Sequence, residues 1–266
     1  MTLPPGNGSA VVEFQGVDFA YQERSIVTGL DLVIPRGEVL ALVGRSGAGK
    51  STVLRLVNRL LLPDAGTVLV EGRDTREWDA IALRRRTGYV LQDVGLFPHL
   101  TIEDNVTLVP RLQGASVEER HVRAAELLAL VGLPAAEYAQ RWPRELSGGQ
   151  RQRVGVARAL AARPPVLLMD EPFGALDPVT RVELQREFQR IQNELRQTAI
   201  IVTHDIAEAF TLGTRVGVLD EGRLIACDTP DVIARAADQR VQRFLDTLAM
   251  PVSPKPRRSE GGPWTS

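Results

Sequence analysis

Residues 44–51 read Gly-Arg-Ser-Gly-Ala-Gly-Lys-Ser, and no other segment says more about the fold class of the chain. The segment fits the pattern GxxxxGK[ST], which is expected to connect a buried strand to the start of a helix. Residues 39–43 are all apolar, as a buried strand requires, and apolar residues recur at helical spacing over residues 53–60. A glycine-rich turn that happens to contain a lysine is the plainer alternative, but such a turn does not by itself predict a buried strand before it and a helix after it.

The loop between these two predicted elements has the chemistry of a phosphate-binding P-loop. Its glycines allow the backbone to curl so that successive N–H groups point inward, and the helix start adds a partial positive charge. Lys50 is expected to neutralise β- and γ-phosphate oxygens, and the Ser51 hydroxyl to ligate Mg²⁺. Lys50 and Lys255 are the only lysines among 32 basic residues, and a compact ammonium suits this position better than a planar guanidinium. The expected ATP-binding residues here are Gly44, Arg45, Ser46, Gly47, Ala48, Gly49, Lys50, Ser51 and Thr52.

Two acidic residues and a histidine follow the other buried strands that the sequence predicts. Asp170 and Glu171 come directly after the apolar run of residues 166–169, and His204 follows residues 200–203. Fully apolar strands belong to parallel sheets covered on both faces, and α/β proteins bind ligands at the carboxyl edge of such sheets. One carboxylate can hold Mg²⁺ while the other acts on water. A solvated turn for the acids and a structural role for His204 are the alternatives.

Residues 146–150 read Leu-Ser-Gly-Gly-Gln. This pentapeptide resembles the signature motif of ABC ATPases, which opens a helix and presents serine and glycine N–H groups to the γ-phosphate of an ATP held by a second subunit. The residues expected to act in trans are Ser147, Gly148, Gly149 and Gln150. The resemblance extends over about residues 11–250, where the motifs occur in the family's order. It implies that one chain alone does not complete an ATP site.

The same resemblance implies roles for the acids and the histidine. Asp170 matches the Walker B aspartate, which binds the metal ion together with Ser51, and Glu171 matches the general base that polarises the attacking water. His204 matches the switch histidine, which contacts the γ-phosphate and orders that water. Gln92 matches the Q-loop glutamine, a catalytic and metal-binding residue that links the site to a transmembrane partner. An exposed loop glutamine is the alternative for Gln92.

Two further positions follow from the resemblance. Residues 174–177 look like the D-loop, through which Asp177 contacts the partner subunit, and Asp177-Pro178 is also a typical helix start with the aspartate as N-cap. Tyr21, near the end of the first predicted strand, corresponds to the aromatic residue that stacks on adenine. Ordinary packing within the strand is the alternative for Tyr21.

The resemblance implies an α/β fold, with a RecA-like P-loop NTPase core, an antiparallel β subdomain and a helical insertion, as in ABC ATPases. Proline and glycine mark both chain ends, so residues 1–10 and 251–266 are expected to be flexible tails around an ATPase domain of residues 11–250. The helical insertion is expected over about residues 93–145. Within it, Ser116-Val117-Glu118-Glu119 forms a capping box that predicts the start of a helix.

Short apolar runs also suggest which strands pair. Residues 30–34 and 39–43 are expected to form a hairpin around the turn Pro35-Arg36-Gly37. Residues 67–70 and 87–91 are expected to form a second short pair.

The composition excludes several classes of protein. The 266 residues are 44% hydrophobic with a formal net charge of −1, as in a soluble globular protein. No apolar run approaches the ~20 residues that span a bilayer, and residues 1–10 lack a signal-peptide pattern. The single cysteine, Cys227, excludes an internal disulfide and a cysteine-cluster metal site. Balanced, mixed charges argue against nucleic acid as a partner.

Three segments look most like the ATPases of osmoprotectant importers, which carry glycine betaine, carnitine, choline and related quaternary amines. They are residues 88–92, 95–101 and 169–178. A polar amino acid importer is the alternative transport function, although its ATPases usually lack the Phe173-Gly174 pair. A non-transport ABC ATPase is the alternative of a different class, and the signature pentapeptide argues against a P-loop kinase or GTPase.

The protein implied by this resemblance hydrolyses ATP with Mg²⁺ and powers solute import. Its implied partners are a second copy, in an ATP-dependent head-to-tail dimer, and transmembrane permease subunits, with a substrate-binding protein acting indirectly. The permease contact is expected around residues 92–112, where Phe97, Pro98 and Leu100 form an apolar cluster that suits either a docking groove or burial inside the subdomain. The implied location is the cytoplasmic face of a bacterial inner membrane, reached through the permease.

Overall fold

The structure is a computed structural model of the chain, and it describes residues 10–249. Ala10 begins the first strand. The two tails expected from the sequence, over residues 1–10 and 251–266, otherwise lie outside the described residues.

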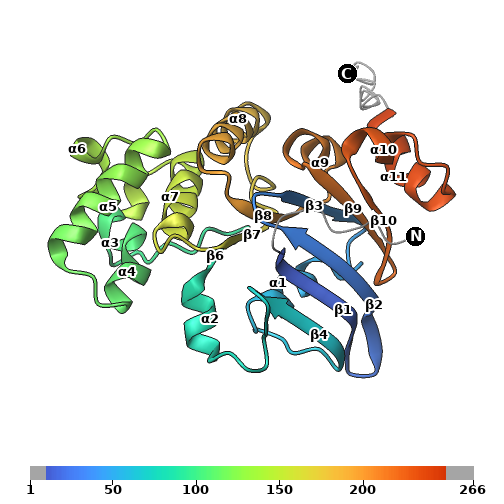
Figure 1. The fold of residues 1–266 in the computed structure, drawn as a ribbon. Helices are drawn as coiled ribbons and strands as arrows, with labels where there is room; N and C mark the ends of the chain where they lie inside the picture. Colours follow the sequence, from blue (N-terminus) through green and yellow to red (C-terminus); the bar gives the residue numbers. More distant parts are fainter. Residues whose placement is uncertain (1–9, 250–266) are drawn as a thin grey trace, which may run out of the picture.

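Six strands form a mainly parallel sheet in the order β10-β9-β3-β8-β7-β6 (Figure 1). They are β3 (Val39–Gly44), β6 (Thr87–Val90), β7 (Val166–Asp170), β8 (Thr198–Val202), β9 (Arg215–Asp220) and β10 (Arg223–Asp228). All neighbouring strands are parallel except β9 and β10, which are antiparallel. β3 and β8 are buried along their whole length, as their apolar sequences indicate.

Four strands form a second, antiparallel sheet in the order β2-β1-β4-β5. They are β1 (Ala10–Tyr21), β2 (Arg24–Pro35), β4 (Ala65–Val70) and β5 (Arg73–Asp74). A tight turn at Gln22 and Glu23 joins β1 to β2, and their φ angles of 46° and 66° are left-handed. Two-residue hairpin turns of this kind match the twist of the strands that they connect.

Two of the expected strand pairings are wrong. β2 and β3 lie in different sheets, so residues 35–37 connect the sheets instead of closing a hairpin. β4 and β6 also lie in different sheets. The reason is that β1 pairs along one edge with β2 and along the other with β4, while β6 extends the parallel sheet beside β7.

Helices surround the sheets, and Figure 1 shows a group of helices, α3–α6, at one end of the molecule. The helices flanking the strands are α1 (Lys50–Val57), α2 (Ala80–Arg86), α8 (Pro178–Leu195), α9 (Ile206–Leu212), α10 (Pro230–Ala234) and α11 (Gln239–Ala249). The group at the end comprises α3 (Ile102–Val106), α4 (Leu108–Leu112), α5 (Val117–Leu130) and α6 (Ala135–Tyr138), followed by the 3₁₀ turn η1 (Pro143–Glu145) and α7 (Gly148–Leu160). The predicted capping box between Ser116 and Glu119 opens α5. None of the described helices is long and apolar enough to cross a membrane.

Alternate residues of the central strands enter two separate hydrophobic clusters, because successive side chains of a strand point to opposite faces. On β7, Leu167 and Met169 join a cluster formed with α5, α7 and α8. Val166 and Leu168 join another cluster, formed with α1 and the antiparallel sheet. Both faces of the parallel sheet are therefore covered, which holds the loops at its carboxyl edge on a rigid support.

Candidate functional site

The site residues predicted from the sequence leave three neighbouring parallel strands at one edge of the sheet. Leu42 of β3 and Asp170 of β7 both align with Val202 of β8. Parallel strands end on the same side, so the loops after β3, β7 and β8 converge there. The phosphate loop, the two acids and His204 are thus brought together by the strand register.

Residues 44–49 connect β3 to α1 in a tight loop that requires glycine. Gly47 and Gly49 have φ angles of 81° and 97°, which L side chains rarely adopt. A Cβ atom on Gly49 would lie 2.6 Å from the carbonyl oxygen of Ile26, whereas one on Gly47 would meet no atom within 4 Å. Gly49 therefore packs the loop against β2, and Gly47 faces open space.

Lys50, the first residue of α1, folds back over the loop. Its Nζ donates hydrogen bonds to the carbonyl oxygens of Gly44 at 2.8 Å and Arg45 at 3.1 Å, and the residue is only 6% exposed. Burial lowers the pKa of Lys50 below its usual range, and the nearby Glu171 and Asp170 carboxylates oppose that shift. The ammonium is therefore held above the loop, where phosphate oxygens would stabilise its charge.

Ser51 and Asp170 supply two oxygen atoms beside the loop. The Ser51 Oγ donates a hydrogen bond of 2.9 Å to Asp170 Oδ1. A hydroxyl and a carboxylate are hard oxygen ligands of the kind that Mg²⁺ prefers. The residues present at this position therefore fit the expected magnesium ion.

Tyr89 of β6 adjoins the same carboxylate and was not singled out from the sequence. Its hydroxyl group interacts with the Asp170 carboxylate, which raises the pKa of Tyr89, and with Arg55 of α1, which lowers it. Burial, assisted by the charge of Asp170, raises the pKa of Tyr89 to about 12. Tyr89 therefore stays protonated and can orient Asp170. The contact joins residues far apart in the sequence, so no local pattern could have indicated it.

Glu171 and His204 form a pair at the same edge. Nδ1 of His204 lies 3.2 Å from Glu171 Oε2, and the histidine side chain is 63% exposed. Glu171 has a left-handed φ of 46°, and its N–H donates a 2.8 Å hydrogen bond to the carbonyl oxygen of Val202. A glutamate in this conformation is strained, and backbone strain of this kind is concentrated at functional sites. The arrangement leaves a carboxylate oriented by an accessible imidazole.

Gln92 and Tyr21 occupy exposed positions near the ends of two other strands. Gln92 follows β6 by two positions and is exposed, and Tyr21 ends β1 with 63% of its surface exposed. In the part of the chain that the structure describes, neither side chain forms a hydrogen bond with the phosphate loop, Asp170 or Glu171. Their roles stay predictions from the resemblance.

The signature residues cap α7 and are not hydrogen-bonded to the phosphate loop of the same chain. The Ser147 hydroxyl accepts from the N–H of Gln150 at 3.2 Å, and Gln150 Oε1 accepts from the N–H of Ser147 at 2.8 Å. Ser147 and Gly148 are exposed, whereas Gly149 is buried against Thr180. The first N–H groups of a helix have no partner within it, so this end of α7 can accept an anion.

Asp177 caps α8, as the sequence indicates. Its carboxylate accepts hydrogen bonds of 3.1 Å from the N–H groups of Val179 and Thr180. These bonds, above all those from Thr180, hold the pKa of Asp177 below its usual range. Asp177 and Val179 are both exposed, so the start of α8 is accessible to another molecule.

Comparison with known proteins places this geometry in a family. The sequence profile of the ABC transporter family matches residues 27–174. The osmoprotectant import ATP-binding protein OsmV of Salmonella typhimurium is 47% identical over 84% of this chain and 59% of its own length. The glycine betaine uptake system ATP-binding protein YehX of Escherichia coli is 45% identical over 88% of this chain and 76% of its own length.

A solved structure supports the same assignment. The dimeric post-hydrolysis state of the ATP-binding cassette MJ0796, bound to ADP and Pi, has a TM-score of 0.72 and 34% identity, over 82% of this chain and 98% of that one. The likeness confirms the predicted P-loop NTPase fold of the ABC type. The chain spans about three fifths of the length of the OsmV relative. Profile, relatives and fold agree, and the chain belongs to the ABC transporter family as a member of its ATP-binding proteins.

Proposed function

We propose that this chain is the ATP-hydrolysing subunit of an ABC importer. The observation that carries the proposal is the pairing of Glu171 with His204 at the same sheet edge as the Ser51–Asp170 pair. Beside them lies a glycine-rich loop that ends at the buried Lys50. A phosphate cradle, two oxygen ligands and an oriented base are the parts that ATP hydrolysis requires.

In the proposed reaction, the N–H groups of residues 44–49 and the Lys50 ammonium hold the β- and γ-phosphates. Ser51 and Asp170, together with Gln92, would hold Mg²⁺, and the ion would neutralise charge on the phosphates. Glu171 accepts a proton from the attacking water, and His204 keeps that carboxylate oriented and contacts the γ-phosphate.

The remaining nucleotide contacts are proposed on the same grounds. Tyr21 would stack on adenine, because its exposed ring is free to meet a base. Ser147 and Gly148 would bind the γ-phosphate of an ATP held by a second copy, since they are exposed and their helix start is free to accept an anion. Asp177 would lie in the same interface. The MJ0796 relative is a dimer bound to ADP and Pi, and a head-to-tail dimer would complete two sites here at once.

The contact with a permease is proposed at the loop around Phe97. Hydrogen bonds of the buried Asn105 side chain fix the conformation of this loop. Phe97 is 41% exposed and Pro98 is also exposed, so the alternative of burial does not hold for them. Asn105, which is fully buried, accepts from the Phe97 N–H at 2.8 Å and donates to the carbonyl oxygens of Phe97 and Leu100 at 3.1 Å and of Thr101 at 2.9 Å. An apolar loop preorganised in this way suits a protein partner, because little entropy is lost on docking.

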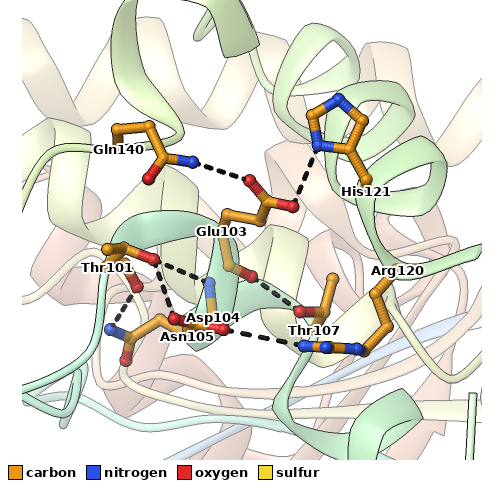
Figure 2. A network of polar contacts seen from close by, with 8 residues as sticks. All are labelled: Thr101, Glu103, Asp104, Asn105, Thr107, Arg120, His121 and Gln140. Atoms are coloured by element: carbon orange, nitrogen blue, oxygen red, sulfur yellow. Dashed lines mark hydrogen bonds and ion pairs between the residues drawn. The ribbon is translucent and has the colours of Figure 1, made fainter. Parts of the chain in front are cut away.

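Figure 2 shows that α3, the helix that follows this loop in the sequence, is tied to its neighbours by polar contacts. Glu103 of α3 lies 3.0 Å from Nδ1 of His121 on α5 and accepts a 3.0 Å hydrogen bond from Gln140. Asp104 lies 3.6 Å from Arg120. These contacts join α3 to α5 and to the segment after α6, so movement of the loop would be transmitted to the helical group.

The proposed solute is an osmoprotectant of the quaternary amine class, such as glycine betaine. The names of the OsmV and YehX relatives support this class. We place the chain at the cytoplasmic face of a bacterial inner membrane, attached to permease subunits that receive solute from a binding protein.

Two measurements test the proposal. The purified chain incubated with ATP and Mg²⁺ should release inorganic phosphate, and EDTA or the Lys50→Ala substitution should stop the release. Absence of phosphate release in the presence of the permease would contradict the enzymatic part. Cells that express the chain with its permease and binding protein should take up labelled glycine betaine, and uptake of a polar amino acid instead would contradict the solute class.

A further inference from the structure

A buried carboxyl follows the Glu171–His204 pair closely along the chain, on the first turn of α9, four residues after His204. Glu208 is only 5% exposed, and its Oε1 atom has no hydrogen-bond partner among the described residues. The helix start at which it lies is capped by Asp205, whose carboxylate accepts from the N–H groups of Ala207 at 2.9 Å and Glu208 at 3.3 Å. An acidic group buried so deeply is costly unless its proton or a partner compensates.

The backbone on both sides of His204 is attached to this region. The Thr203 hydroxyl accepts a 3.0 Å hydrogen bond from the Asp205 N–H, and its interaction with the Glu208 side chain opposes the raised pKa of that carboxyl. The Thr203 N–H donates to the carbonyl oxygen of Leu42, at the end of the strand that leads into the phosphate loop. A change at Glu208 therefore reaches the residues before and after His204.

Among the described residues, Arg181 of α8 is the cation whose charge acts most strongly on Glu208. Its Nη2 donates a 3.2 Å hydrogen bond to the carbonyl oxygen of Leu176, and its Nη1 lies 3.8 Å from Asp205 Oδ2. Its buried Nε has no partner in the described chain. Leu176 belongs to the predicted D-loop, so Arg181 joins the segment expected to meet a second subunit to the segment that contains His204.

The cluster thus holds a buried donor without an acceptor, Arg181 Nε, and a buried acceptor without a donor, Glu208 Oε1. They are close enough to interact electrostatically, yet Arg181 is within ion-pair distance of Asp205 only. We propose that Glu208 is a positioning residue for ATP hydrolysis, which competes with Asp205 for Arg181 and so sets the position of His204 against Glu171. The inference rests on the proposed ATPase function.

The charge state of Glu208 decides the competition. Burial raises the pKa of Glu208 to about 7, the carboxylates of Asp205 and Glu171 add to the shift, and Arg181 and the Thr203 hydroxyl oppose it. When Glu208 is neutral, Arg181 stays with Asp205 and Leu176, as in the structure. When Glu208 ionises, it attracts Arg181 away from both, and the support behind His204 loosens.

The test compares the pH profiles of the wild-type chain and the Glu208→Gln variant, which keeps the side chain neutral at similar volume. As the pH rises through about 7, the kcat of the wild type should fall relative to the variant by about fivefold, the effect of one rearranged charged hydrogen bond. The KM for ATP should be the same in both, because the phosphate loop is unchanged. Glu183→Gln, at an exposed position of α8 two residues after Arg181, is the matched control and should give the wild-type profile.

A second pair of variants locates the effect in Arg181. In an Arg181→Gln background, Glu208→Gln should no longer alter the profile, because the shared cation is gone. Asp205→Asn, which weakens the competing partner, should lower kcat at neutral pH without changing KM. Parallel profiles of the wild type and Glu208→Gln would overturn the inference while leaving the ATPase function intact, whereas a wild-type chain without activity at any pH would contradict the proposed function itself.

A third measurement needs no catalysis. Because the folded-state pKa of Glu208 lies above the usual value of 4.5, the folded protein binds more protons than the unfolded chain between these values. Stability is therefore lost as the pH rises from about 4.5 to about 7 and is constant above that range. The melting temperature of the wild type should fall relative to Glu208→Gln over this interval, and a constant difference would show that Glu208 does not titrate there.

Discussion

At the sheet edge, the positive charge of the buried Lys50 lies near the negative charges of two carboxylates, Glu171 and Asp170. Lys50 is desolvated by the loop that it covers, which lowers its pKa, and Glu171 and Asp170 act in the opposite direction. Each carboxylate is in turn held by a neutral or ionisable partner, Ser51 for Asp170 and His204 for Glu171. Substitution of one member therefore changes the electrostatics of the others as well as its own chemistry.

Glu171→Gln should abolish turnover. The amide cannot accept a proton from water, so the rate of phosphate release should fall by about a hundredfold or more, while ATP binding is kept and the ATP-bound dimer accumulates. Phosphate release and size-exclusion chromatography with ATP measure the two effects. Glu221→Gln is a matched control, because Glu221 has the same left-handed φ of 46° but lies in the turn after β9. Normal hydrolysis by Glu171→Gln would remove Glu171 as the base.

Ser51→Ala should raise the Mg²⁺ concentration needed for half-maximal hydrolysis. The substitution removes one of the two paired oxygens and leaves the Asp170 carboxylate, so affinity for the ion should drop about tenfold, within the range of a lost charge-assisted contact. A titration of phosphate release against Mg²⁺ gives the value, and Ser25→Ala, on the exposed part of β2, serves as the control. An unchanged Mg²⁺ requirement would exclude Ser51 as a ligand.

At the scale of helices and strands, short-range sequence patterns predict where an element begins wherever a helix cap or an apolar run is present. The capping boxes at Ser116 and Ser147 and the N-cap at Asp177 open helices α5, α7 and α8, as local hydrogen bonding predicts. Helix α3 is different, because its first turn also organises the loop before it through the buried Asn105. The conformation of the loop that exposes Phe97 therefore depends on helix α3, which follows it.

Asn105→Ala should destabilise the helical insertion and leave the nucleotide site unaffected. The substitution removes four hydrogen bonds to the loop, and partial hydration of the freed groups limits the loss to about 2 to 3 kcal/mol. Denaturant unfolding measures the loss, with the exposed Asn193→Ala on α8 as the control. Intact ATP binding together with weaker coupling to the permease is expected, and full stability of the variant would show that water replaces Asn105 in the loop.

At the scale of the whole molecule, one chain contains the phosphate loop and the segment that we propose acts on the nucleotide of a second copy, and the two are not hydrogen-bonded to each other among the described residues. The phosphate loop and the acids share one sheet edge, whereas residues 147–150 are bonded to each other and to Tyr138. Two copies related head to tail would place the half-site of each against that of the other.

A mixture of two inactive variants should regain activity. Lys50→Ala disables the phosphate loop and Ser147→Arg blocks the signature, so each homodimer has no working site. A heterodimer keeps one intact site, formed by the phosphate loop of one copy and the signature of the other. Random mixing should restore up to about a quarter of the wild-type rate of phosphate release, since half of the dimers are mixed and each has one of two sites. No gain over the separate variants would contradict the composite geometry.

Features formed by residues close together in the sequence could be predicted from local patterns. Features formed by segments that are far apart in the sequence could not. The phosphate loop, the acids after β7 and His204 after β8 could be found from strand ends and motifs alone, and their proximity followed from parallel register. The expected pairings of β2 with β3 and of β4 with β6 are wrong, because β1 pairs with both β2 and β4 in the antiparallel sheet, while β6 pairs with β7. Gln92, Tyr21 and the trans role of the signature were available only through resemblance.

The amino-acid sequence alone therefore determined the elements, their caps and the residue types at the sheet edge, because each of these depends on interactions within a few positions. The interactions among site residues from different elements depend on contacts between segments that are far apart in the sequence. Tyr89 interacts with Asp170, and Arg181 joins Leu176 to Asp205, across segments that no local pattern relates. Burial in the packed interior is what shifts the proton affinities of Tyr89 and Glu208, and burial is a property of the folded chain.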